Sequence, residues 1–157
     1  MTSDPPVRLA VPDDADDIAA MSRELIEHGL PWSWRPARVR NAIRDPDTNV
    51  AVVRMDGALV AFGIMEYLEA DAYLALLAVR ETRQRTGIGR SLLRWLEGSA
   101  QVAGCTRIRV EARRDNVAAR TFYNELGYHE VAVTRGRYSD GVDGTKLEKW
   151  LRAAPGP

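Results

Sequence analysis

The chain contains few of the residues that build metal centres or disulfide frameworks. It has one cysteine, Cys105, and two histidines, His28 and His129, among 157 residues. A single cysteine excludes an internal disulfide, and these three side chains do not follow any usual zinc-ligand spacing. We therefore expect no metal in the functional site, and we interpret Cys105 as a small packing residue.

Long apolar runs are missing as well. No hydrophobic stretch approaches the roughly 18 residues of a transmembrane helix, and the first residues lack the basic and then apolar pattern of a secretory signal. We expect a cytoplasmic protein. Hydrophobic residues make up 45% of the chain and charged residues 28%, which excludes a disordered or low-complexity chain. The length predicts a single domain over residues 1–157, with an ordered core from about residue 6 to about residue 152.

An excess of charge of one sign is missing too. Lys plus Arg and Asp plus Glu are both 22, so the formal net charge is zero, which disfavours a nucleic-acid-binding protein. Nearly all the basic residues are arginines, and we attribute this bias to a GC-rich, bacterial genome. The arginines between Arg80 and Arg94 form a local cationic stretch that suits a small anion. Binding of nucleic acid, a weaker alternative, would use Arg107, Arg109, Arg113, Arg114 and Arg120.

Hydrophobic periodicity predicts the regular elements. Apolar residues alternate in some segments and recur at helical spacing in others, and Asp56-Gly57 is a strong hairpin signal. The order of the elements predicts a mixed α+β fold, with about seven mostly antiparallel strands in one sheet and about four flanking helices. The predicted strands are Val7–Val11, Asn49–Met55, Ala58–Leu68, Ala72–Val79, Arg107–Ala112, Val131–Arg137 and Thr145–Leu151. The predicted helices begin near Asp13, Arg38, Gly87 and Asn116. The third is the longest, with Ile88, Leu92 and Leu96 at helical spacing, and the fourth has an apolar face of Ala118, Phe122 and Leu126 with Tyr123 at its rim.

The segment Gln84-Arg-Thr-Gly-Ile-Gly89 follows a buried strand and opens a helix. The first N–H groups of a helix have no partner within the helix, and glycines let the backbone approach a phosphate closely. Two known nucleotide motifs do not fit, because Walker A needs a lysine and the dinucleotide fingerprint needs glycine where Leu92 stands. We therefore predict an anion-binding loop of another kind.

Two motifs together identify a family resemblance. Gln84–Gly89 matches the pattern Q/R-x-x-G-x-G/A, and Asn116–Tyr128 matches N-x-x-A-x-x-F-Y-x-x-x-G-[FY] in full. With these motifs in this order, the chain resembles the GCN5-related N-acetyltransferase (GNAT) superfamily. The resemblance runs from the first strand to the last and is vague only between Leu30 and Asp47, a region where such enzymes usually select their substrate.

The resemblance implies that acetyl-CoA is the co-substrate and that its acetyl group passes directly to a primary amine within a ternary complex. The pyrophosphate would bind the loop amides, and pantetheine would pair with backbone at the end of the Ala72–Val79 strand, as an added strand does. An amide there could also hold the developing oxyanion. The implied cofactor-binding residues are Leu77, Ala78, Val79, Gln84, Arg85, Thr86, Gly87, Ile88, Gly89, Arg90, Asn116 and Tyr123. Asn116 is equally an ordinary helix N-cap.

The resemblance also implies the catalytic residues. Tyr123 matches the tyrosine that donates a proton to the departing thiolate, and Glu111 matches the proton acceptor of ribosomal-protein N-terminal acetyltransferases. The role of Glu111 stays open, because it alternates with Arg107 and Arg109 on the strand and could merely pair with them. Glu66 on the hairpin is a competing base, and water alone is a third possibility.

The acceptor is not identified by the sequence. Trp32 and Trp34 are candidates for one wall of its pocket and Tyr138 for the other, with Asp140 and Asp143 there favouring a cationic amine. We interpret His28 as a structural residue of the first helix. A protein N-terminus and a small amine such as a polyamine or aminoglycoside both stay open as acceptors, as does a homodimer. A non-catalytic acyl-CoA-binding module is the alternative from another functional class.

Overall fold

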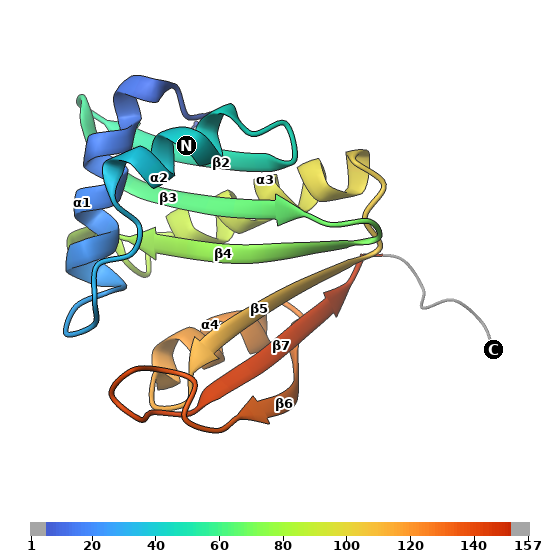
Figure 1. Ribbon diagram of the computed structural model, residues 1–157. Coiled ribbons are helices and arrows are strands. Elements are labelled where there is room, and N and C mark those ends of the chain that lie inside the picture. The colour runs from blue at the N-terminus through green and yellow to red at the C-terminus, as the bar shows by residue number, and fades with distance from the viewer. Residues whose placement is uncertain (1–5, 152–157) are drawn as a thin grey trace.

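The computed structural model describes residues 6–151, in which seven strands form one open sheet in the order β1-β2-β3-β4-β5-β7-β6 (Figure 1). All neighbouring strands are antiparallel except β4 and β5. The strands are β1 (Arg8–Leu9), β2 (Thr48–Met55), β3 (Ala58–Tyr67), β4 (Asp71–Val79), β5 (Arg107–Arg113), β6 (His129–Thr134) and β7 (Gly144–Trp150). The helices are α1 (Ala15–Leu25), α2 (Pro36–Arg44), α3 (Ile88–Val102) and α4 (Val117–Glu125), with short 3-10 turns at Pro12–Asp14 and Glu81–Arg83.

The predicted mixed α+β fold is confirmed, including the hairpin between β2 and β3. Its two turn residues, Asp56 and Gly57, have φ angles of 53° and 81°. Two consecutive residues with positive φ are what the tight primed hairpin turns require, and this is why Asp-Gly predicts them.

Two strand predictions are wrong in their extent. The first strand covers only Arg8–Leu9, because Pro12 starts a 3-10 turn soon afterwards. The strand predicted over residues 131–137 instead runs from His129 to Thr134. Gly127, at φ +94°, ends the preceding helix early enough for pairing to begin at His129, and Gly136, at φ +59°, turns the chain away after the strand.

Helices cover both faces of the sheet (Figure 1). α1 and α2 pack on one face of β2, β3 and β4, with a core that includes Ile18, Phe62 and Ile64. α3 packs on the opposite face through Leu92 and Leu96, and α4 joins this second core through Tyr123. We call these the α1/α2 face and the α3/α4 face of the sheet.

A bulge in β4 lies beside the place where β4 and β5 separate. Ile64 of β3 pairs with Leu76 and Met65 pairs with Leu74, so Ala75 is an extra residue. As a result, the neighbours Ala75 and Leu76 both pack on the α1/α2 face, whereas Leu74 packs on the α3/α4 face. Beyond the bulge, β4 keeps β3 as its partner but no longer has β5.

β4 and β5 pair over a short distance. The paired residues run from Asp71 with Arg107 to Leu74 with Val110. Beyond that point the two strands diverge toward their carboxyl ends, as Figure 1 shows. The divergence leaves the sheet as two halves, β1 to β4 and β5 to β7, which are adjacent at one end only.

Asp14 anchors the start of α1 to the edge of the sheet. Its carboxylate, 4% exposed, accepts hydrogen bonds from Arg8 Nη1 at 2.9 Å, the backbone N–H of Val11 at 2.8 Å and Arg54 Nε at 3.0 Å. Burial by itself raises the pKa of Asp14, but these donors outweigh it and lower the pKa to about 2. The ionised carboxylate therefore contributes to the stability of the fold.

We expect Asp14→Asn to lower the free energy of unfolding at pH 7 by about 2 kcal/mol, the value of a pKa lowered by nearly two units. Because the folded pKa lies below the ordinary value of 3.8, this contribution is present above pH 4 and disappears as the pH falls to 2. Urea unfolding at several pH values measures it. Asp16→Asn is the control, since Asp16 is 79% exposed. Equal destabilisation by both variants would contradict the anchoring role of Asp14.

Candidate active site

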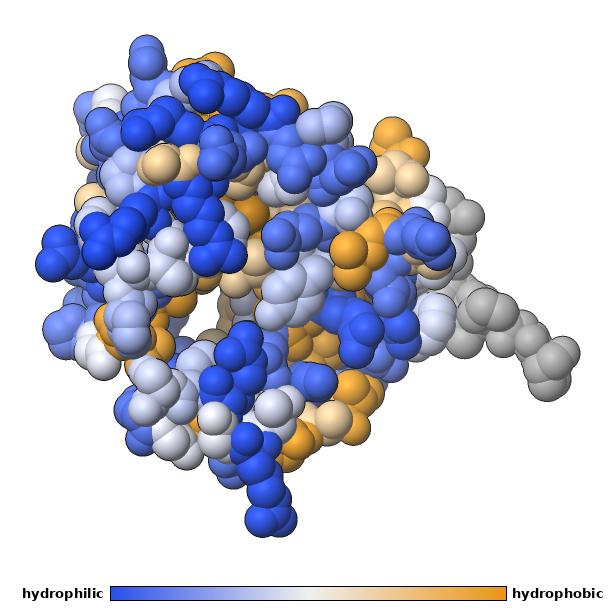
Figure 2. Space-filling view, viewed as in Figure 1, coloured by the Kyte–Doolittle hydropathy of each residue, from blue (hydrophilic) through white to orange (hydrophobic). Residues whose placement is uncertain are grey.

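The divergence of β4 and β5 opens a cleft between the two halves of the sheet. Figure 2 shows the molecule hollowed at this place, between the halves that Figure 1 draws above and below. The loop that leads from β4 into α3 begins at the open end of β4. α4 covers the second half of the sheet, so residues from several elements border the cleft.

The β4–α3 loop presents a run of unused backbone donors. Within residues 6–151, none of the six backbone N–H groups from Arg85 to Arg90 donates a hydrogen bond to the protein. The first donor of the helix is Ser91 N–H, which bonds to Gly87 O at 3.0 Å. Gly87 has φ +90°, and open space surrounds the position of a Cβ there. The free amides and the N-terminus of α3 together form the site that an anion needs.

The charge of this loop is also uncompensated. In the described part of the chain, Arg83, Arg85 and Arg90 form no ion pair with a carboxylate. Gln84 has a different place from the amides, because its side-chain Nε2 donates to Val79 O at 3.0 Å and holds the loop against the strand. Thr86 likewise donates from Oγ1 to Arg83 O. These two side chains fix the loop, and the backbone remains available to a ligand.

The free edge of β4 faces the cleft. Arg80 N–H bonds to Val60 O of β3 at 2.9 Å, so alternation directs the backbone groups of Ala78 to β3 as well and those of Leu77 and Val79 to the opposite side. β5 has already diverged there. The backbone groups of β4 that face the cleft without a partner are therefore those of Leu77 and the N–H of Val79, because Val79 O already accepts from Gln84 Nε2. Ala78, which was predicted to bind the cofactor with them, is bonded to β3 instead.

Tyr123 is the buried residue of α4, at 7% exposure. Its ring packs edge-on against Phe122 and Tyr128, with centroids 5.2 Å and 5.5 Å away. Burial, followed by the nearby Tyr73, raises the pKa of Tyr123 well above its ordinary value. The phenol is therefore protonated at neutral pH, and within residues 6–151 its hydroxyl has no hydrogen-bond partner.

The buried face of α4 differs in one position from the predicted one. Ala118 is exposed, and Ala119 packs on the core in its place, beside Phe122 and Leu126. This shift puts Tyr123 inside the apolar face and not at its rim. The N-cap interpretation of Asn116 is confirmed, because its Oδ1 accepts from Ala119 N–H at 3.0 Å. Its amide nitrogen is not used in that bond.

Sequence reasoning missed the network that supports Tyr123. Tyr128, 1% exposed, donates from its hydroxyl to Glu97 Oε2 of α3 at 2.8 Å, and Lys149 Nζ of β7 binds the same carboxylate at 3.1 Å. Burial, and then the charge of Glu97, raises the pKa of Tyr128. A signal existed in the sequence, since Glu97 stands next to Leu96 on the apolar face of the longest predicted helix.

Glu111 lies one residue beyond the last β4–β5 pair, at the start of the cleft. Its Oε1 accepts from Arg137 Nε at 2.7 Å, while Oε2 is buried and has no partner. The alternative that it pairs with Arg107 and Arg109 is wrong, because those two guanidinium groups lie against Asp71. An unpartnered buried carboxylate oxygen can accept a hydrogen bond from a ligand or a water molecule.

Glu111 and Tyr123 approach the cleft from opposite faces of the sheet. Glu111 shares its face with Tyr73 and Glu66, which pair across β3 and β4, and alternation places this face on the α1/α2 side. Tyr123 belongs to the core on the α3/α4 face. Burial, and then the charge of Glu111, raises the pKa of Tyr73. Sequence reasoning missed Tyr73, although it is the one hydroxyl-bearing residue of an otherwise apolar strand.

The loop between β6 and β7 does not offer the free carboxylates that were predicted. Asp140 pairs with Arg113 at 2.6 Å, and the pKa of Asp140 is lowered by this contact. Asp143 accepts from the backbone N–H of Gly136 at 2.8 Å. Both carboxylates therefore hold the loop in shape. Tyr138 lies between Arg113 and Arg137, at 5.0 Å and 5.6 Å from their guanidinium carbons.

The other predicted residues of the acceptor wall divide into two groups. Trp34 is 8% exposed and packs into the core beneath Arg38, so it does not line a pocket. Trp32 does line one. His28 is exposed in the loop after α1, which ends at Leu25, so its assignment to the first helix is wrong. Cys105 is 1% exposed, and its interpretation as a packing residue is confirmed.

Two general findings complete the description. Among residues 6–151, no three His, Cys, Asp or Glu side chains gather as a metal site would require. None of the helices in this part of the chain is long and apolar enough to cross a membrane.

Comparisons with known proteins agree with this geometry. Residues 17–128 match the model of the Acetyltransferase (GNAT) family. The [Ribosomal protein bS18]-alanine N-acetyltransferase of Escherichia coli is 30% identical over 120 residues, which cover 76% of this chain and 79% of that protein. The crystal structure of the ribosomal-protein-S18-alanine N-acetyltransferase from Escherichia coli superposes with a TM-score of 0.79 at 26% identity and covers 96% of both chains. A PaiA N-acetyltransferase from Thermoplasma acidophilum, in complex with coenzyme A, shares the fold at a TM-score of 0.79 and 19% identity, over 95% of this chain and all of that one.

Proposed function

The chain belongs to the acetyltransferase (GNAT) family, and from this premise we propose that it transfers the acetyl group of acetyl-CoA to the amine at the N-terminus of a protein or peptide. The observation that carries the proposal is the run of six free backbone N–H groups from Arg85 to Arg90, beside the gap in the sheet at which Glu111 stands. The N-terminal acceptor is favoured by the similarity to the enzyme of Escherichia coli that acts on an alanine of ribosomal protein bS18.

Acetyl-CoA would bind along the α3/α4 side of the cleft. The six free amides from Arg85 to Arg90 suit its pyrophosphate, and the uncompensated arginines of the loop add positive charge. The free backbone groups of Leu77 and the free N–H of Val79 suit the amides of the pantetheine arm, which would pair with them as an added strand does. The unused amide nitrogen of Asn116 is a further donor at the start of α4.

The acceptor amine would approach from the α1/α2 face. Its nitrogen attacks the carbonyl carbon of the acetyl group, and a backbone amide of β4 stabilises the oxyanion that forms. The carbon–sulfur bond then breaks, and the thiolate takes the proton of the Tyr123 hydroxyl, which burial keeps protonated. The proton lost by the attacking nitrogen passes through a water molecule to Glu111 Oε2, the oxygen that has no partner in the protein.

An N-terminal acceptor matches the modest proton-accepting machinery. An α-amine has an ordinary pKa of about 8, so part of it is already neutral near pH 7, whereas a lysine side chain near about 10.4 is not. One carboxylate oxygen and a water molecule are enough for the first acceptor. We further propose that the catalytic domain takes in the whole sheet from β1 to β7.

The decisive experiment measures acceptor-dependent release of free thiol from acetyl-CoA. The acceptor panel holds peptides with varied N-termini, the same peptides with blocked N-termini, polyamines, aminoglycosides and free amino acids. Turnover of the unblocked peptides alone supports the proposal. Turnover of small amines alone contradicts the N-terminal acceptor, and binding of acetyl-CoA with no turnover on any amine would identify a non-catalytic binding module.

We expect Gly87→Glu to weaken the binding of acetyl-CoA by at least about 30-fold, because a carboxylate would occupy the place of the pyrophosphate. Calorimetry measures the dissociation constant. Gly104→Glu is the matched control, since Gly104 has φ +89° against +90° for Gly87, also has open space around it, and lies at the far end of the same helix. A similar loss in both variants would point to backbone strain and not to the phosphate.

We expect Tyr123→Phe to lower kcat by about 100-fold or more, the usual contribution of a general acid, with little change in the affinity for acetyl-CoA. Rapid-quench measurement of the chemical step avoids masking by product release. Tyr67→Phe is the control, because Tyr67 is a half-buried tyrosine away from α4 whose hydroxyl accepts a hydrogen bond from Asn49 Nδ2. Full turnover in Tyr123→Phe would remove the residue from the mechanism.

We expect Glu111→Gln to lower kcat/KM for a peptide about tenfold or more at pH 7 and much less at pH 9. The reason is that a peptide α-amine is mostly neutral at pH 9 and needs no base. The pH profile of the two enzymes measures this difference. Glu66→Gln tests the competing base, and a stronger, pH-dependent loss in that variant would reverse the assignment.

A further inference from the structure

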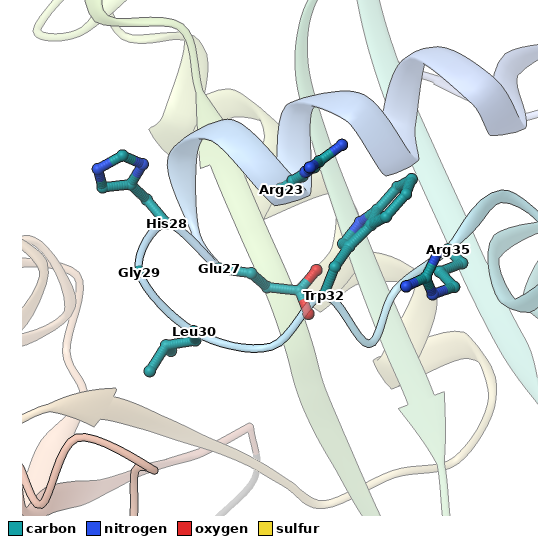
Figure 3. Close-up of a pocket in the computed structure, with 7 residues that line it drawn as sticks. All are labelled: Arg23, Glu27, His28, Gly29, Leu30, Trp32 and Arg35. Atoms are coloured by element: carbon teal, nitrogen blue, oxygen red, sulfur yellow. The ribbon is translucent and has the colours of Figure 1, made fainter.

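The connection between α1 and α2 forms a pocket of about 490 Å³ (Figure 3). Its walls come from the last turn of α1 and the loop that follows. The lining residues are Arg23, Glu27, His28, Gly29, Leu30, Trp32 and Arg35. Of these, only Trp32 and His28 were singled out by the sequence, and the functional argument above uses none of them.

The one carboxylate in this pocket is already satisfied. Glu27, 7% exposed, accepts hydrogen bonds from Ser22 Oγ at 2.8 Å, from Ser33 N–H at 2.7 Å and from Trp34 N–H at 3.2 Å. Burial alone raises the pKa of Glu27, but these donors lower it below its ordinary value. Glu27 therefore shapes the loop as an ionised group whose oxygens are turned to protein donors. It is not a free site for a cation.

Beside Glu27 and the imidazole of His28, the polar side-chain groups of the pocket are donors from Arg23, Arg35 and Trp32. The guanidinium carbons of Arg23 and Arg35 lie 4.9 Å and 4.8 Å from the ring centre of Trp32, and Figure 3 shows Trp32 between them. Neither arginine forms an ion pair within residues 6–151. The indole Nε1–H of Trp32 is buried and has no acceptor. Two unpaired guanidinium groups and an orphaned N–H are complementary to a carboxylate or a phosphate.

The pocket lies on the side of the sheet from which we propose that the acceptor amine approaches. Glu24, in the last turn of α1, lies 3.7 Å from Arg80, the residue that follows β4 at the open end of the cleft. The pocket continues from this turn on the α1/α2 face, the same face that carries Glu111 and Tyr73. A ligand group held there would be on the side from which the amine approaches.

We propose that this pocket binds a carboxylate of the acceptor, so that the enzyme prefers peptides with acidic residues close behind the N-terminal amine. The inference rests on the proposed function and narrows it to one acceptor class. Arg23 and Arg35 supply the charge, and Trp32 holds both guanidinium groups in place by stacking. A carboxylate and a phosphate both offer anionic oxygens to these donors. The alternative ligand of the pocket is therefore a phosphate of acetyl-CoA.

The experiment uses three peptides that begin with alanine and continue with Asp-Glu-Glu, Asn-Gln-Gln or Arg-Lys-Lys before a common neutral tail. Thiol release gives KM and kcat for each peptide and for acetyl-CoA, in the wild type, Arg23→Gln, Arg35→Gln and the double variant. Arg38→Gln is the matched control, because Arg38 also stacks on a tryptophan of this loop, at 3.8 Å from Trp34, but does not line the pocket. Calorimetric binding of each peptide to the complex with coenzyme A provides a readout that does not depend on turnover.

We expect the acidic peptide to have the lowest KM of the three in the wild type. In each pocket variant, its KM should rise about tenfold or more. The KM of the amide peptide should change less than about twofold in these variants, and Arg38→Gln should give the KM values of the wild type. Equal losses for the acidic and amide peptides, or a preference for the basic peptide, would overturn the inference while leaving acetyl transfer intact. A raised KM for acetyl-CoA in the pocket variants would assign the pocket to a cofactor phosphate instead. If no peptide is turned over, the proposed function fails, and arginine-dependent binding of the acidic peptide alone then decides for or against the pocket.

Discussion

The short pairing between β4 and β5 is the constraint on which the rest of the structure depends. The two strands are held together only from Asp71 with Arg107 to Leu74 with Val110, and the bulge at Ala75 marks the point where they separate. Separation leaves the outer backbone groups of Leu77 and Val79 without a strand partner, although Gln84 binds Val79 O, and it leaves Glu111 at the start of the gap. The α3 amides are at hand because α3 starts from the open end of β4. A fully paired sheet would have none of these groups available.

The two halves of the sheet are kept in register by few polar contacts. At the closed end, Arg107 holds Asp71 at 2.8 Å. On the α3/α4 face, the buried carboxylate of Glu97 on α3 binds both Tyr128 and Lys149 of the second half. Since Tyr128 packs against Tyr123, this carboxylate connects α3, the helix that follows the proposed phosphate loop, to the residue that we propose as the general acid. Buried polar contacts of this kind specify geometry more than they add stability.

Much of the fold and part of the site could be predicted from the sequence. Local signals carried the successes: Asp56-Gly57 for the hairpin, helical spacing from Ile88 to Leu96, and glycines that end helices. The two motifs identified the family because they are continuous in the chain, and the β4–α3 loop has the free backbone N–H groups that an anion-binding loop needs. The failures involve contacts between distant segments. No local pattern around Glu111 predicts that Arg137 is its ion-pair partner. In the same way, no local pattern around Asp140 predicts its ion pair with Arg113. The bulge at Ala75 could not be predicted either. It changes which residues of β4 face which side of the sheet, but the strand is apolar on both sides of the bulge, so its composition gives no sign of it.

The arrangement of the two faces has a consequence for how the products depart. The proposed cofactor groups lie on the α3/α4 side and the proposed acceptor groups on the α1/α2 side, with the open gap between β4 and β5 between them. In this arrangement, each substrate reaches the gap from its own side of the sheet. Coenzyme A and the acetylated chain can leave independently, in either sequence, without one waiting behind the other. If the acceptor is a polypeptide, as we propose, it can enter, react and leave while the nucleotide end of coenzyme A is still bound, which a single shared entrance would not permit.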